Sequence, residues 1–211
     1  MENVQSNKLL GSGIGRDCGI AFALEGARGV VFADLNLASA QEAAELSKEH
    51  ATHAEFRALA LAVDVVDIES VRKMVADSVD AFGRIDYCIN SAGVGTRRRQ
   101  ESALVTPLPW LTYLFSKIGV IEPRDITDLS TTEFERFISV NVRGSLHCIQ
   151  EVSKVMRQQT PVTIKGRSGD RDIGRGAIVN LGSVSSFVAV QNVSPYTISK
   201  HAVLGLTKSA G

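Results

Sequence analysis

The chain has 211 residues, and its 23 lysine and arginine residues balance 23 aspartate and glutamate residues, so the formal net charge is zero. This balance argues against a protein that binds nucleic acid or an anionic membrane surface. With 44% hydrophobic and 22% charged residues, the composition is that of one globular domain and excludes a disordered or fibrous chain.

The cysteines and the N-terminal segment indicate the cellular compartment in which the protein is expected. Cys18, Cys88 and Cys148 lie far apart without metal-ligand spacing, which predicts free, mostly buried thiols and no metal site. The first residues lack the basic flank and apolar run of a signal peptide, and no apolar stretch reaches membrane length. We therefore expect a cytoplasmic protein.

The first part of the chain alternates between helical and strand patterns. In chain order, these patterns predict a helix that starts in the glycine cluster at 11–15 and ends near Gly26, a buried strand over 30–33, a helix over 36–50, a buried strand over 59–63, a helix from Asp67 to Gly83 and a strand over 85–89. Each of the first two strands is followed by an aspartate.

The second part continues the alternation. A long amphipathic helix is expected from Thr132, where Thr132 and Glu135 form a capping box, and Asn141 is the polar exception on its apolar face. Residues 158–176 are rich in charge and glycine and predict an exposed loop. A strand over 177–181 and a helix from about Pro195 to the end complete the chain.

Strands that alternate with helices specify the α/β class. The pattern predicts a single domain over 1–211, with a doubly wound parallel sheet and right-handed crossovers. Ligands in such sheets bind at the carboxyl ends of the strands.

Two segments do not fit this scheme. A first strand should precede the glycine cluster, but residues 5–8 are polar and poorly suited to a central strand, so this strand is either weak or absent. Residues 96–119 form an insertion without clear periodicity, within which residues 97–99 predict a solvated charge run. We interpret the insertion as a retained intron, and a native lid near the active-site mouth is the alternative.

The glycine cluster and the first strand-end aspartate predict a nucleotide site. Backbone amides at the start of a helix favour a pyrophosphate, and Asp34 follows at the distance where a carboxylate accepts hydrogen bonds from a ribose. A tight turn before a helix, with Asp34 as a strand-end cap, is the structural alternative.

Ser183, Tyr196 and Lys200 form a second constellation. If Tyr196 lies in the first turn of the last helix, Lys200 shares its face, and a nearby ammonium favours the phenolate form of a tyrosine. Ser183, just after the last strand, could donate to a carbonyl oxygen that faces the same phenol. A chance match of the tyrosine and lysine, with Ser183 as a turn serine, is the alternative.

Taken together, the motifs of this sequence resemble those of the short-chain dehydrogenase/reductase family, in particular its fungal members. The resemblance covers residues 11–95 and 120–211. The matching pieces, in the family's order, are GSGIG at 11–15, Asp34, Val63 and Asp64, NSAG at 90–93, Asn141, GSVS at 182–185 and YTISK at 196–200.

The resemblance implies a Rossmann-like fold and a role for each catalytic residue. Tyr196 would exchange a proton with the substrate oxygen, while Lys200 would support the phenolate and hold the nicotinamide ribose. Ser183 would orient the carbonyl or alcohol, and Asn141 would hold a water in the proton relay. The implied reaction is hydride transfer between a nicotinamide and an alcohol or ketone carbon.

The resemblance also implies a cofactor site with no metal. The residues that would bind the cofactor are Gly11, Ser12, Gly13, Ile14, Gly15, Asp34, Asp64, Val65, Asn90, Ala92, Gly93, Tyr196 and Lys200. We expect NAD rather than NADP, because Asp34 would repel a 2′-phosphate and Ser12 stands where phosphate-preferring relatives often carry a basic residue. The expected partners are a small alcohol or ketone and, in a full-length form, further copies of the chain.

The sequence departs from the family pattern in two places. Lys8 and Leu9 stand where the family has threonine and glycine, which predicts a damaged phosphate turn. The chain also stops before the family's last strands and substrate lid, which predicts exposed apolar residues at Val203, Leu204 and Leu206 and a marginally stable, weakly active or inactive chain. A catalytically impaired nucleotide-binding or interaction protein is therefore the second hypothesis.

Overall fold

The computed structural model describes residues 5–9, 13–95, 125–167, 169–189 and 191–211. The insertion expected over 96–119 lies outside the described residues, so both of its interpretations stay open. The chain divides into two compact units, Met1–Ala92 with Ser145–Leu181 and Gly93–Gly144 with Gly182–Gly211. The expectation of a single domain stays a prediction.

The first unit is built on a five-stranded parallel sheet in the order β3-β2-β1-β4-β7. Its strands are β1 (Gln5–Leu9), β2 (Gly29–Asp34), β3 (Arg57–Ala62), β4 (Tyr87–Asn90) and β7 (Ala177–Asn180). Every residue of β2 except Asp34 is buried, as the apolar run in this strand predicts. The prediction of a buried strand over 59–63 is wrong in its burial, because β3 lies at the sheet edge and is half-exposed.

The first strand is present, and it is central. The backbone of Asn7 pairs with Val31 of β2 on one side and with Cys88 of β4 on the other. A parallel strand gains hydrogen bonds from both neighbours, and this pairing outweighs the weak strand preference of its residues. Of the two open alternatives, absence of the strand is wrong.

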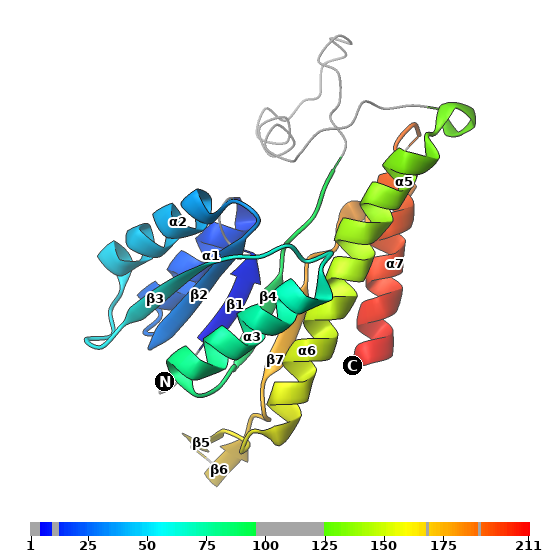
Figure 1. Ribbon diagram of the computed structural model, residues 1–211. Helices are drawn as coiled ribbons and strands as arrows, with labels where there is room; N and C mark the ends of the chain where they lie inside the picture. Colours follow the sequence, from blue (N-terminus) through cyan, green and yellow to red (C-terminus); the bar gives the residue numbers. More distant parts are fainter. Residues whose placement is uncertain (1–4, 10–12, 96–124, 168, 190) are drawn as a thin grey trace, which may run out of the picture. The chain divides into compact units, whose positions relative to one another are not determined.

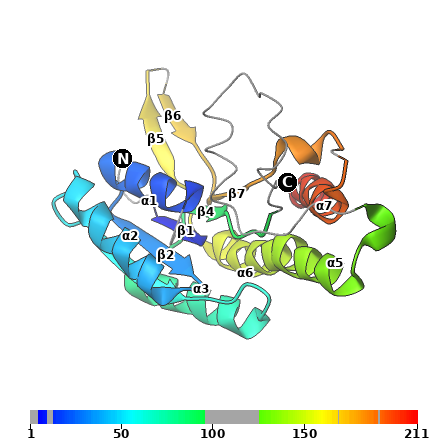
Figure 2. The same ribbon diagram turned by 90° about the horizontal axis from the view of Figure 1, so that it is seen from above.

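Four helices cover the sheet, because parallel strands are joined by crossover connections that are usually helical. They are α1 (Ile14–Leu24), α2 (Leu37–His50), α3 (Ile68–Phe82) and α6 (Gly144–Gln158). Figure 2 shows α3 and α6 on the face of the sheet opposite α1. Caps define two of these helices: the Asn36 side chain accepts hydrogen bonds from the first turn of α2, and Asp67 does the same for α3. Gly83 ends α3 with φ 82°, as predicted.

The close packing of α3 on β2 explains why a glycine stands at position 29, the first residue of β2. A Cβ at Gly29 would lie 2.2 Å from Cε1 of Phe82, the last residue of α3. Arg57 of β3 holds the same ring in place, since its guanidinium lies 4.9 Å from the ring centroid and donates a hydrogen bond to the Ala81 carbonyl at 2.7 Å. Gly29 therefore creates the space that the Phe82 ring fills.

The segment predicted as an exposed loop over 158–176 is exposed but contains regular structure. β5 (Thr163–Gly166) and β6 (Gly169–Asp172) form an antiparallel hairpin, which Figure 1 shows beside the start of β7. All residues of both strands are exposed. The loop prediction was wrong because the strands pair with each other and bury no apolar face, so they leave no periodic hydrophobic signal.

In the residues that the structure describes, the regular elements of the second unit are helical. Its elements are η1 (Ile126–Asp128), α5 (Thr131–Phe137), the π-helical turn η2 (Ile138–Arg143), η3 (Val184–Ser186) and α7 (Ser194–Ala210). α5 and α7 lie side by side (Figure 1). The predicted capping box at Thr132 and Glu135 is wrong, because the helix begins one residue earlier, with Ser130 as its N-cap.

The apolar residues of α7 are less exposed than expected. Val203 is 2% exposed, and Leu204 and Leu206 are half-buried. The predicted exposure of Val203 is therefore wrong. Among the described residues, no helix is long and apolar enough to cross a membrane.

Candidate functional site

The first unit carries its predicted site residues at one edge of the sheet. Asp34 is the last residue of β2, Asp64 follows β3, and Asn90 is the last residue of β4. Because these strands are parallel, their carboxyl ends meet at the same edge, next to the N-terminus of α1.

Gly13 is the N-cap of α1 and has a conformation that favours glycine. Its φ of 63° and ψ of −144° lie in a region that side-chain-bearing residues essentially do not adopt. Gly15 is buried at the start of the helix, whereas Ile14 is 57% exposed. Gly13 therefore places no side chain over the N-terminus of α1. Gly11 and Ser12, predicted for the same turn, lie outside the described residues.

The two strand-end aspartates order the backbone that follows them. Asp34 Oδ1 accepts a hydrogen bond from the Asn36 N–H at 2.9 Å, and Asp64 Oδ1 accepts one from the Val66 N–H at 2.9 Å. The carbonyl oxygen of Val65, which is buried, lies 2.9 Å from Nδ1 of His147 on α6. The hydrogen bond from the Asn36 N–H agrees with the interpretation of Asp34 as a strand-end cap.

Asn90 is buried between two neighbouring strand ends. Its Nδ2 donates to Oδ1 of Asn180 on β7 at 2.7 Å, and its backbone carbonyl accepts from the Leu181 N–H at 3.0 Å. Ala92 is partly buried, and it is the last residue of the NSAG sequence that belongs to the first unit. These bonds hold the chain as it leaves β4.

The second unit contains all four predicted catalytic residues, and α7 carries two of them. Tyr196 lies in the first turn, as predicted, and Lys200 lies one turn later, with its Nζ 5.8 Å from the Tyr196 ring centroid. Phe137 of α5 packs edge-on against the Tyr196 ring, at 6.4 Å between centroids. Lys200 is 7% exposed, and this burial lowers the pKa of its ammonium group.

Asn141 is fully buried in the π-helical turn η2, and its amide is the centre of a hydrogen-bond network. Its Oδ1 accepts from the Val94 N–H at 2.8 Å, while its Nδ2 donates to the Val94 carbonyl at 3.0 Å and to Ser199 Oγ at 2.9 Å. Such π-helical turns inside longer helices frequently occur at functional sites.

Gly93 lies against the same groups. A Cβ there would be 3.3 Å from Oδ1 of Asn141 and 3.9 Å from Nζ of Lys200. Because Gly93 has no side chain, the amide of Asn141 and the ammonium of Lys200 approach the backbone of residues 93–94. The geometry thus brings together Gly93, Asn141, Tyr196 and Lys200 within one unit.

Ser183 caps the short helix η3. Its Oγ accepts a hydrogen bond from the Ser185 N–H at 3.2 Å, and its own N–H donates to Ser186 Oγ at 3.1 Å. This arrangement matches the turn-serine alternative. A hydroxyl that accepts one hydrogen bond still has its proton to donate, so the cap is compatible with a second role.

Sequence reasoning missed two residues of this unit. Ser199 belongs to the YTISK sequence, and its position three residues after Tyr196 places it on the same side of a helix. Phe137 lies within the amphipathic helix that the sequence predicts from Thr132. The contact of its ring with the Tyr196 ring joins α5 to α7, and no local sequence pattern predicts this contact.

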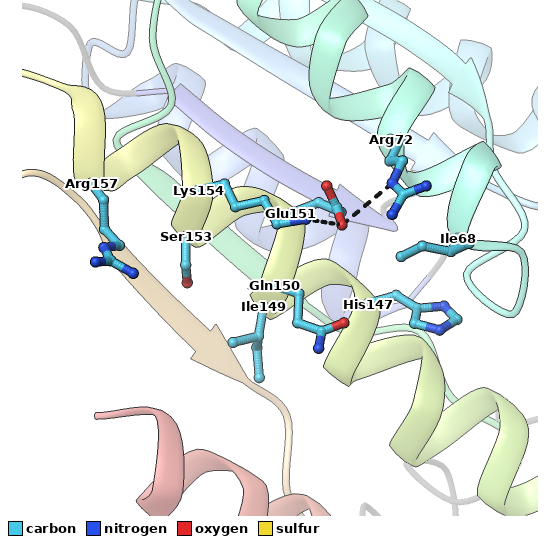
Figure 3. A pocket seen from close by; sticks show the side chains of 9 residues that line it. All are labelled: Ile68, Arg72, His147, Ile149, Gln150, Glu151, Ser153, Lys154 and Arg157. Carbon is cyan, nitrogen blue, oxygen red and sulfur yellow. Dashed lines mark hydrogen bonds and ion pairs between the residues drawn. The ribbon is translucent and has the colours of Figure 1, made fainter.

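A separate cavity of about 560 Å³ lies in the first unit, between α3 and α6. Figure 3 shows the side chains that line it, Ile68, Arg72, His147, Ile149, Gln150, Glu151, Ser153, Lys154 and Arg157. The Glu151 carboxylate pairs with Lys154 at 2.7 Å and with Arg72 at 3.5 Å, and the hydrogen bond from Lys154 lowers its pKa. Of the predicted catalytic and cofactor residues that the structure describes, none lines this cavity.

The cysteines are free thiols, as expected. Cys88 and Cys148 are buried, and burial raises the pKa of the Cys148 thiol to about 12. Such thiols stay protonated and unreactive at neutral pH. In the part of the chain that the structure describes, no group of three or more histidine, cysteine or acidic side chains could hold a metal ion.

The chain is similar to known proteins along nearly its whole length. Residues 10–211 match the family model described as short chain dehydrogenase. The short-chain dehydrogenase anuF of Penicillium roqueforti is 43% identical over 200 residues, which are 95% of this chain and 64% of that protein. The short-chain dehydrogenase fogB of Aspergillus ruber is also 43% identical over 200 residues, with the same coverage of each chain.

A solved structure supports the same relationship. The crystal structure of levodione reductase superposes with a TM-score of 0.73 and 25% identity, covering 99% of this chain and 64% of that one. The chain therefore spans about 64% of the length of the relatives it matches.

Proposed function

The chain belongs to the short-chain dehydrogenase family, and from this premise we propose that the protein transfers a hydride between a nicotinamide dinucleotide and an alcohol or ketone carbon of a small organic substrate. The observation that carries the proposal is the arrangement of Tyr196, Lys200 and Asn141 in one compact unit. A phenol, a buried ammonium one helical turn away and an ordered amide are groups suited to proton transfer.

In this proposal Tyr196 is the acid and base. Its hydroxyl gives a proton to the substrate oxygen during reduction and takes it back during oxidation. Lys200, being cationic, favours the phenolate that this exchange requires, and its burial strengthens the electrostatic interaction because little water screens it. The edge-on Phe137 ring fixes the plane of the phenol.

Ser183 and Asn141 complete the set. The Ser183 hydroxyl donates to the substrate oxygen and orients the reacting carbon, while η3 keeps its backbone in place through the reciprocal bonds with Ser185 and Ser186. Asn141 lies in the π-helical turn, and we assign to it the water of the proton relay toward Lys200.

The residues at the sheet edge fit a dinucleotide. The start of α1 suits a pyrophosphate, because the helix N-terminus attracts anions and Gly13 has no side chain to obstruct it. When bound, the nicotinamide supplies or accepts the hydride. Lys200 would hold its ribose, and Gly11, Ser12, Ile14, Gly15, Asp64, Val65, Asn90, Ala92 and Gly93 would complete its binding site.

We propose NAD rather than NADP. Asp34 carries a negative charge at the end of β2, and the sequence continues with Leu35 and Asn36, so no basic residue follows directly that could accept a 2′-phosphate. A carboxylate there accepts from ribose hydroxyls and repels a phosphate.

We propose a cytoplasmic location for the protein. The reduced thiols suit a cytoplasmic protein that acts on a small molecule and not on a nucleic acid or a membrane. We also propose that the full-length form assembles as a homo-oligomer. Sedimentation of that form would test the assembly.

Binding and turnover measured together test the proposed function. The purified protein is titrated with NADH and NADPH, and oxidation of NADH is then followed with a panel of small ketones. We expect micromolar or tighter NADH binding and turnover with at least one carbonyl compound. Failure to bind either cofactor would contradict the proposal.

The second hypothesis, a catalytically impaired nucleotide-binding protein, rests on Lys8 and Leu9, which replace the family's threonine and glycine. Both residues belong to β1, and the rest of the turn lies outside the described residues. NADH binding without turnover on any carbonyl compound would favour this second hypothesis.

A further inference from the structure

Ser199 joins two of the proposed catalytic residues through its hydroxyl group. Its Oγ accepts a hydrogen bond from Nδ2 of Asn141 at 2.9 Å and donates one to the backbone carbonyl of Tyr196 at 2.8 Å. The residue is 0% exposed and directly precedes Lys200. The hydroxyl thus uses both its proton and a lone pair inside the unit.

The network continues from Asn141 to the backbone of residue 94. Nδ2 of Asn141 has two protons, which it donates to Ser199 Oγ and the Val94 carbonyl, and Oδ1 accepts from the Val94 N–H. The chain of bonds therefore runs from Val94 through Asn141 and Ser199 to Tyr196. It joins a loop, the π-helical turn η2 and the first turn of α7.

We propose that Ser199 is a positioning residue, whose hydroxyl holds the first turn of α7 against η2 and thereby sets where Tyr196 and Lys200 lie relative to Gly93 and Val94. The proposal rests on the proposed function. Ser199 touches neither substrate nor cofactor in it and acts only through Asn141 and the Tyr196 backbone.

The physical reason is that the network fixes three segments far apart in sequence. Without the hydroxyl, one N–H of the buried Asn141 loses this acceptor, and a buried polar group without its partner destabilises the arrangement that contains it. A displacement of about 1 Å in a catalytic group can lower a rate by roughly 10²-fold. The effect on the reaction should therefore exceed the effect of losing one hydrogen bond elsewhere on the helix.

The test compares Ser199→Ala with Ser199→Thr, which keeps the hydroxyl, and with Ser209→Ala. Ser209 is a matched control, because its Oγ also donates to a carbonyl of α7, that of Gly205 at 2.8 Å, but it is exposed and does not contact Asn141. The first readout is hydrogen exchange of the Val94 amide. The second is NADH affinity by fluorescence titration, and the third is the pH profile of kcat with the best carbonyl substrate.

For Ser199→Ala we expect faster exchange at Val94, NADH affinity weaker by roughly 2- to 10-fold, and kcat lower by roughly 10- to 100-fold. The pH of half-maximal kcat should shift, since Lys200 would no longer be held beside the phenol. Ser199→Thr should restore the exchange protection and the pH profile, and Ser209→Ala should leave all three readouts unchanged.

Two results would overturn the proposal. Unchanged exchange at Val94 in Ser199→Ala would show that the hydroxyl does not hold Asn141, and faster exchange with unchanged NADH affinity and pH profile would leave Ser199 a structural residue only. If the unaltered protein bound NADH but turned over no carbonyl compound, the proposed function would fail. In that case exchange at Val94 and NADH affinity would still decide the role of Ser199.

Discussion

The Nζ of Lys200 lies 5.8 Å from the centroid of the Tyr196 ring, one helical turn further along α7. Lys200 is 7% exposed, so bulk water screens its charge little. The helix places the two residues one turn apart, and contacts from other segments add to this: the Phe137 ring packs against Tyr196, and Asn141 donates a hydrogen bond to Ser199 beside Lys200. Changes at these residues should separate proton transfer from cofactor binding.

Tyr196→Phe should remove the transferable proton and keep the ring. We expect kcat to fall by about 10²- to 10⁴-fold, because one acid and base group is lost. NADH affinity should change little, since a phenylalanine ring preserves the edge-on contact with Phe137. Stopped-flow turnover and fluorescence titration measure the two effects, and retained turnover would refute the assigned role of Tyr196.

Lys200→Met should change the pH dependence of stability. Burial lowers the pKa of Lys200 from 10.5, so in the interval just below pH 10.5 the unfolded chain binds more protons than the folded one. The contribution of Lys200 to the free energy of unfolding therefore rises with pH in this interval. Urea unfolding at several pH values should show this rise in the unaltered protein and not in the variant.

The control for this experiment is Lys208→Met, near the exposed end of the same helix. It should leave the pH profile parallel to that of the unaltered protein. An identical profile for Lys200→Met would show that Lys200 keeps its proton equally well in both states.

Asp34→Asn should relax the choice between NADH and NADPH. The variant keeps an oxygen that can accept from the Asn36 N–H, as Asp34 does at 2.9 Å, but it loses the charge that would repel a 2′-phosphate. We expect NADPH affinity to increase by roughly tenfold, the equivalent of about 1.4 kcal/mol, with NADH affinity weakened. Isothermal titration with both cofactors gives the answer, and an unchanged ratio of affinities would argue against a ribose site at Asp34.

Gly29→Ala should destabilise the first unit, because its Cβ would lie 2.2 Å from the Phe82 ring. Overpacking of this kind costs about 1–3 kcal/mol of unfolding free energy. In a Phe82→Ala background the same substitution should cost much less, which makes the pair a double-mutant test. Urea denaturation measures all four proteins of this cycle.

Gly205→Ala is the opposite case and serves as the control. Gly205 is exposed inside α7, and a Cβ there would meet no atom within 4 Å. Alanine should stabilise the helix by roughly 0.5–1 kcal/mol, because it restricts the unfolded chain more than glycine does. Equal destabilisation by both glycine substitutions would contradict the packing explanation.

Local patterns were sufficient to predict most elements and the positions of several site residues. Asp67 and Gly83 mark the ends of α3 because a cap acts within one helical turn of its own residue. Patterns that span only a few residues also predict that Asp34 lies at the end of β2 and that Tyr196 and Lys200 share one helix. These features need no contact with distant parts of the chain.

Other features were decided only by tertiary structure, since they depend on partners that are remote in sequence. β1 exists despite its polar residues because β2 and β4 pair with it from both sides. β5 and β6 pair with each other without an apolar pattern. Ser199 gains its role because Asn141, 58 positions away, comes within 2.9 Å of its hydroxyl. A single sequence records the residue types in such a network, but the bonds between them form only when the segments that carry them pack together.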